Sequence, residues 1–139
     1  MPSHLFVYGT LRSESRHPVA QRLRGQAKLV GKASTPGVLC DFGWYPGALF
    51  RPDAKTRVVG DVYALRHARR LLAQLDDFEI GDPVSPFFRR IAIVVRLDGG
   101  RALESWTYEL CEAPARLKPI ESGDFILHRR LRAGRPLRA

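Results

Sequence analysis

The chain has 139 residues, of which 45% are apolar and 27% charged, and these values are ordinary for a soluble globular protein that folds as one domain. No apolar run approaches the roughly 18 residues of a membrane helix, and the N-terminus lacks a basic region followed by an apolar signal segment. We therefore expect a cytoplasmic protein without a membrane partner, whose net charge of +9 is the one unusual feature of its composition.

The first predicted element is a short buried strand at Leu5–Val7, which Gly9 breaks. A short helix is expected over His17–Arg24, because Pro18 suits the first helical position and Gly25 follows the last one. The next segments are a strand at 27–32, a loop leading into a short strand over 35–40, an aromatic turn at 41–47, and strands at 48–50 and 58–65 around a polar turn at 52–56.

The clearest helix covers 65–78, where apolar residues recur every three or four positions and arginines occupy the other side. Gly81 and Pro83 prevent its continuation. The segments 91–97 and 102–110, joined by Asp98-Gly99-Gly100, predict a β-hairpin. A loop or short helix at 114–123 and a short segment at 124–127 follow. Several strands with two helices predict an α+β fold with a curved or closed sheet.

The last twelve residues, 128–139, are rich in arginine and predict a flexible, solvated tail after a domain of residues 1–127. Such a tail could contact an acidic partner or nucleic acid. However, the chain has no zinc-ligand spacing, recognition-helix pattern or aromatic-and-basic strand, so the sequence argues against nucleic-acid binding. Cys40 and Cys111 are isolated and are expected to be reduced.

Tyr8-Gly9-Thr10-Leu11 is the first candidate for a binding site. A strand that ends in glycine beside a small hydroxyl residue can expose backbone N–H groups to a carboxylate, a phosphate or a polarised carbonyl oxygen. The same four residues are equally consistent with an ordinary turn.

An acidic group, Asp76–Glu79, stands where the long helix should end, although acids are unfavourable there against the negative end of the helix dipole. One interpretation is a solvated corner that pairs with Arg89 or Arg90. The other takes Phe78 as a buried anchor that holds Glu79 at the edge of a pocket, where burial would raise its pKa and make it a general base and acid. Spacing alone favours the solvated corner.

Other chemistries lack support in the sequence. The four histidines have no metal-ligand spacing, no serine lies in a G-x-S-x-G context, and no Walker or dinucleotide glycine pattern is present. We therefore expect no metal ion and no cofactor.

The order of the motifs is more informative than any one of them. YGTL at 8–11 is followed by PGVLCDFGWYPG at 36–47, GDVY at 60–63, LDDFE at 75–79, FRR at 88–90, WTY at 106–108 and SGDF at 122–125. From Leu5 to about Phe125 the sequence resembles the γ-glutamylcyclotransferase-like superfamily, in particular its γ-glutamylamine cyclotransferase and AIG2-like branch.

The resemblance implies a small β-barrel of mixed strands with flanking helices. It also implies a reaction in which the substrate's α-amino group attacks its own γ-carbonyl, releasing 5-oxoproline and an amine or amino acid. By matching motif positions, Glu79 is the catalytic residue, and Tyr8, Gly9, Thr10 and Leu11 bind the glutamyl end. The partner would be a small γ-glutamyl compound, for a monomer or a small homo-oligomer.

The sequence departs from the family pattern at two places. Phe88-Arg89-Arg90 stands where Tyr-x-Arg is common, after a loop that is about two residues longer than usual. Asp61 stands where a glutamate is common, and we interpret Asp61 as a structural residue. Phe88, Arg90 and Tyr45 are further candidates for the substrate pocket.

Three alternatives stay open. The protein could remove a γ-glutamyl protecting group from a specialised metabolite, bind a small carboxylate on the same fold without catalysis, or act through its basic tail.

Overall fold

The computed structural model describes residues 2–13, 15–43, 45–81 and 87–133, where the backbone forms six strands and three helices. In chain order these are β1 (His4–Val7), α1 (Pro18–Gln26), β2 (Ala27–Asp41), β3 (Pro46–Phe50), β4 (Arg57–Leu65), α2 (Ala68–Ile80), β5 (Phe88–Leu97), β6 (Ala102–Leu110) and α3 (Phe125–Ala133). None of the helices in these ranges combines the length and apolar character that crossing a membrane would require.

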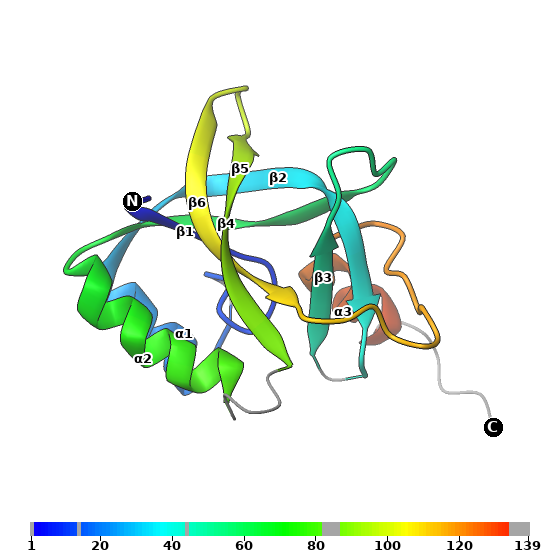
Figure 1. The fold of residues 1–139 in the computed structure, drawn as a ribbon, viewed down its shortest axis with the longest axis horizontal. Coiled ribbons are helices and arrows are strands. Elements are labelled where there is room, and N and C mark those ends of the chain that lie inside the picture. The colour runs from blue at the N-terminus through cyan, green and yellow to red at the C-terminus, as the bar shows by residue number, and fades with distance from the viewer. Residues whose placement is uncertain (1, 14, 44, 82–86, 134–139) are drawn as a thin grey trace.

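Five strands close into a barrel in the order β2-β4-β1-β6-β5, because β2 also pairs with β5. The pair of β1 and β6 is parallel, whereas the other pairs are antiparallel, so the sheet is mixed. Strand β3 extends the sheet beyond β2 as a hairpin. In Figure 1, α1 and α2 lie together at one end of the barrel and α3 lies near β3. The predicted α+β fold with a small mixed barrel is confirmed, with three flanking helices in the described residues rather than two.

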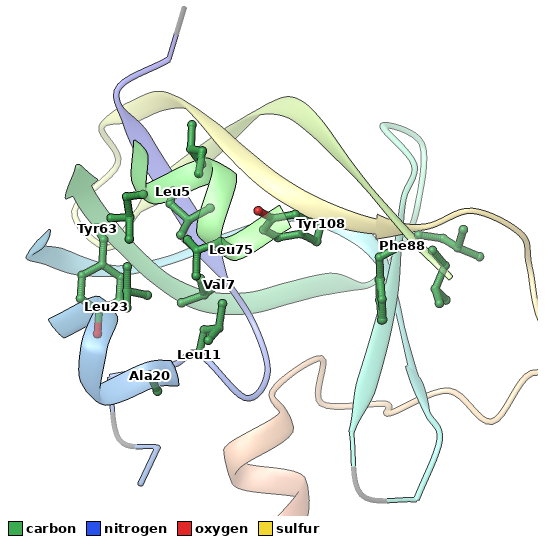
Figure 2. Close-up of a cluster of buried hydrophobic side chains, with 13 residues drawn as sticks. Leu5, Val7, Leu11, Ala20, Leu23, Tyr63, Leu75, Phe88 and Tyr108 are labelled. Atoms are coloured by element: carbon green, nitrogen blue, oxygen red, sulfur yellow. The ribbon is translucent and has the colours of Figure 1, made fainter. Parts of the chain in front are cut away.

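Strand β1 is buried on both faces, which explains its uninterrupted apolar sequence. Leu5 and Val7 belong to a cluster that packs between the barrel and the α1–α2 pair, together with Leu23 and Leu75 (Figure 2). Phe6 points to the other side, into a second cluster inside the barrel. Because side chains alternate along a strand, one short segment connects both cores.

The prediction for residues 27–40 was wrong in one respect. The segment forms one continuous 15-residue strand, β2, with a bulge between Leu29 and Gly31, and the loop that was expected to lead into a short strand within 35–40 is absent. From Ala33 to Leu39, every second residue is buried, but most of these residues are small. The alternation therefore carries little hydrophobic signal, although it follows the two-residue strand period.

The ends of the helices also differ from the prediction. Helix α1 continues through Gly25 to Gln26, and α2 begins at Ala68 rather than Leu65. The predicted flexible tail from residue 128 overlaps α3, which continues to Ala133 because Phe125 anchors it in the barrel cluster. The domain boundary at 127 stays a prediction. Residues 82–86, which hold most of the lengthened loop, lie outside the described residues, as do Trp44 and residues 134–139.

Candidate active site

A cavity of about 180 Å³ lies where the loop after β1 meets the end of α2. The predicted loop Tyr8–Leu11 lines it, as do Glu79, Phe88 and Tyr45, which come from three other segments of the chain. The remaining lining residues are Phe6, Val7, Pro46, Phe78 and Tyr108. The fold thus brings together all but one of the site residues that the sequence predicted. The exception is Arg90, which is not among the described residues of the lining.

Glu79 occupies the last turn of α2, and its carboxylate faces this largely apolar cavity. Burial raises the pKa of the Glu79 carboxyl group from its usual 4.5 to about 7. No hydrogen-bond or ion-pair partner of this carboxylate occurs among the described residues. A carboxyl group with a pKa near neutrality and free oxygens can both accept and donate a proton at physiological pH.

Asp76 is one helical turn before Glu79 and has the opposite environment. The Arg90 guanidinium donates two hydrogen bonds to its carboxylate, at 2.8 and 3.1 Å, and the Tyr108 hydroxyl donates a third at 2.7 Å. Arg90 also stacks over Trp106, with 4.4 Å from its guanidinium carbon to the ring centroid. Its charge is therefore committed to Asp76, so the prediction that Arg90 helps to form the pocket is not supported by this arrangement.

The loop after β1 lines the cavity with residues whose backbone N–H groups lack a partner within the described residues. The N–H of Arg12 donates to the carbonyl of Gly9 at 3.0 Å and closes a turn. Within the described part of the chain, the N–H groups of Gly9, Thr10 and Leu11 have no hydrogen-bond partner. Backbone N–H groups without an internal partner at a cavity wall suit an oxygen ligand. Glycine is needed at position 9 because a Cβ there would lie 2.7 Å from Pro46.

A buried ion network fixes the far end of this loop. Arg12, with 4% of its surface exposed, donates from Nε to Asp61 at 3.3 Å and from Nη1 to Asp124 at 2.7 Å. The N–H and hydroxyl of Ser13 donate to the same Asp61 oxygen, at 2.9 and 3.1 Å. The loop is therefore tied to β4 and to the start of α3, which agrees with a structural role for Asp61.

Tyr8 contributes its ring to the cavity, but its hydroxyl is already bound. The hydroxyl donates to the carbonyl of Tyr108 and accepts a hydrogen bond from the N–H of Ala48 at 3.2 Å. Burial, and next the negative charge of Glu79, raise the pKa of Tyr8 well above its usual value. Tyr8 therefore stays neutral and joins β1 to β6 and β3.

The comparison with known protein families matches these observations. The family described as "Gamma-glutamyl cyclotransferase, AIG2-like" matches residues 5–127, which is most of the chain. The chain belongs to this family.

This AIG2-like chain is similar to one curated protein in sequence and to several solved structures in fold. "Putative gamma-glutamylcyclotransferase MJ1514" of Methanocaldococcus jannaschii is 27% identical over 124 residues, covering 88% of this chain and 94% of that protein. YkqA of Bacillus subtilis has a TM-score of 0.74 at 25% identity; the match covers 97% of this chain but only 44% of YkqA. An AIG2-like protein of Mus musculus has a TM-score of 0.66 at 27% identity, with 87% of each chain covered.

Sequence reasoning misplaced or missed several residues of this AIG2-like site. Phe78 was taken as a buried anchor, yet 42% of its surface is exposed and its side chain lines the cavity. Tyr108 and Pro46 were not predicted, although both lie in motifs that carry the family resemblance. Among the described residues, no group of three or more histidine, cysteine or acidic side chains is placed to hold a metal ion.

Proposed function

We propose that this protein is a γ-glutamyl-amide cyclotransferase that releases 5-oxoproline and an amine or amino acid without a cofactor. The observation that carries this proposal is the Glu79 carboxyl group, which has a pKa of about 7 and lines the same cavity as Gly9, Thr10 and Leu11, whose N–H groups have no partner within the described residues. The family to which the chain belongs points to the same class of reaction.

In the proposed reaction, Glu79 acts as base and then as acid. Glu79 first removes one proton from the substrate's α-ammonium group and releases it to solvent, because only the free amine is nucleophilic. The amine nitrogen then attacks the γ-carbonyl carbon, so that the ring C–N bond forms. Glu79 takes a second proton from the attacking nitrogen and donates it to the leaving nitrogen as the amide C–N bond breaks. The ring nitrogen keeps one hydrogen, and no water is consumed.

The loop after β1 supports two other requirements of this reaction. Negative charge develops on the γ-carbonyl oxygen during the attack, and the N–H groups of Gly9, Thr10 and Leu11 could stabilise it or hold the substrate's α-carboxylate. A cavity of about 180 Å³ would also hold the glutamyl chain in a folded conformation. An intramolecular attack gains much of its rate from this restriction.

The test is to incubate the protein with γ-glutamyl amines and γ-glutamyl amino acids and to measure 5-oxoproline. Glu79→Gln should lower kcat by about 10² to 10⁴-fold, the usual contribution of general acid–base catalysis. Asp77→Asn is the matched control, because Asp77 is an exposed acid of the same helix, and it should retain full activity.

The outcomes separate the alternatives. Turnover only with bulky γ-glutamyl compounds would favour removal of a protecting group, and binding without turnover would favour a carboxylate-binding module. Formation of no 5-oxoproline from any γ-glutamyl donor would refute the proposal. The cytoplasmic location and the monomer or small homo-oligomer remain predictions.

A further inference from the structure

A second cavity, of about 780 Å³, adjoins the first one. The two cavities share Gly9, Thr10, Tyr45 and Phe78, so they are neighbouring compartments on either side of the same residues. In both views the loop after β1 runs between the α1–α2 pair and α3, and α3 supplies the far wall of the larger compartment (Figures 1 and 2). A substrate with its glutamyl end beside Glu79 would extend into this larger compartment.

The larger compartment is strongly basic. Its lining includes Arg16, His17, Arg129 and Arg130, and no aspartate or glutamate is among its described lining residues. Arg16 and Arg129 are exposed, and neither forms an ion pair within the described part of the chain. Grouped cationic side chains create a positive potential, which attracts an anion and offers it several hydrogen-bond donors.

Packing orients two of these basic groups. Nδ1 of His17 accepts a hydrogen bond from the N–H of Val19 at 3.1 Å, so the neutral ring carries its hydrogen on Nε2 and can donate it. The same ring lies 5.4 Å from the ring of Phe78. The guanidinium of Arg129 lies over Phe125, 5.6 Å from its centroid. Contact with an aromatic ring restricts each side chain before a ligand binds, so less conformational entropy is lost on binding.

We propose that the larger compartment binds the leaving group and selects amines that bear an anionic group, a carboxylate or a phosphate. The apolar part of the amine packs on Phe78, Phe125 and Ile126, while Arg16 and Arg129 bind the anion. The inference rests on the proposed function, since it gives the substrate class for the same site.

The test compares γ-glutamyl compounds that differ in the charge of the leaving group but little in its size. γ-Glutamyl-norleucine releases an amine that bears a carboxylate, and γ-glutamyl-norleucine amide releases one whose side groups are neutral. γ-Glutamyl-lysine amide, linked through the α-nitrogen of lysine, releases one that bears a cationic side chain. We expect kcat/KM to fall about tenfold or more from the first to the second, as for loss of a hydrogen bond to a charged group, and further for the third. γ-Glutamyl-aminoethyl phosphate distinguishes a phosphate from a carboxylate.

Variants locate the effect. Arg16→Gln and Arg129→Gln should raise KM for the anionic compounds and reduce their advantage, whereas Arg129→Lys should restore part of it. Arg101→Gln, at an exposed hairpin arginine remote from both cavities, is the matched control and should change nothing.

Equal kcat/KM for the anionic and neutral compounds would overturn this inference and leave the proposed function intact. If neither compound is cleaved, the proposed function fails, and calorimetry with the same two compounds tests the charge preference alone. Equal affinities would then refute the inference, and tighter binding of the anion, lost in Arg16→Gln, would support it.

Discussion

The raised pKa of Glu79 predicts that Glu79→Gln stabilises the folded protein at neutral pH while it lowers activity. A carboxyl group that is harder to ionise in the folded state than in the unfolded state lowers stability once the pH allows ionisation. Below pH 4.5, Glu79 is protonated in both states and costs nothing. Between 4.5 and about 7 only the unfolded state loses the proton, so stability falls as the pH rises, and above 7 the loss is complete.

The size of the effect follows from the same two values. The difference between 4.5 and about 7 corresponds to roughly 3 kcal/mol at 1.36 kcal/mol per pH unit. The glutamine side chain of the variant carries no charge at any pH. The free energy of unfolding of Glu79→Gln, relative to wild type, should therefore be about 3 kcal/mol larger at pH 8.5 than at pH 4.5. Ionisable groups that do not interact with Glu79 cancel in this comparison.

Urea unfolding of both proteins across this pH range measures the difference, and Asp77→Asn, at an exposed acid of the same helix, is the matched control. In parallel, wild-type kcat/KM should rise with pH to a plateau with a midpoint near 7, because the basic form of Glu79 is required. The difference in unfolding free energy between Glu79→Gln and wild type could instead be the same at both pH values. That result would show that folding does not raise the pKa of Glu79, and it would refute the prediction.

Two further predictions concern the scaffold. Arg12→Met leaves Asp61 and Asp124 without their buried partner and should cost about 3–5 kcal/mol in urea unfolding; a loss below about 1 kcal/mol would contradict this. Gly123→Ala should cost more than about 2 kcal/mol, because φ is +68° and a Cβ would lie 1.7 Å from a carbonyl oxygen of β4. Gly25→Ala, in open space on α1, should instead gain about 0.5–1 kcal/mol.

The fold could be predicted where the pattern is local. The β5–β6 hairpin and most of α2 follow from alternation or helical period within about twenty residues, and both were correct in place and type. The continuous course of β2 could not be predicted in this way, because its middle pairs with β4 and β5, which come later in the chain. Helix α3 is positioned by Phe125 in the barrel cluster, which is also a contact with distant residues.

The candidate site could be predicted only in part. The helical period of apolar residues predicted that the buried face of α2 continues from Leu75 to Phe78. The last turn of α2 faces a cavity instead of the core, so Phe78 is partly exposed. The family resemblance, rather than periodicity, identified Glu79. No sequence pattern singles out Arg12, because only the fold brings Asp61 and Asp124 to it.

The parallel pairing of β1 with β6 has a consequence for how the protein assembles. Leu5 pairs with Trp106, and the hydroxyl of Thr107 donates to the carbonyl of Phe6, about one hundred residues away in sequence. Contacts of such long sequence separation form late and slow the folding of a domain. The loop at Gly9 therefore gains its final position only when the barrel closes. A partial opening at this pair of strands would disable the site while α2 and the β5–β6 hairpin stay folded.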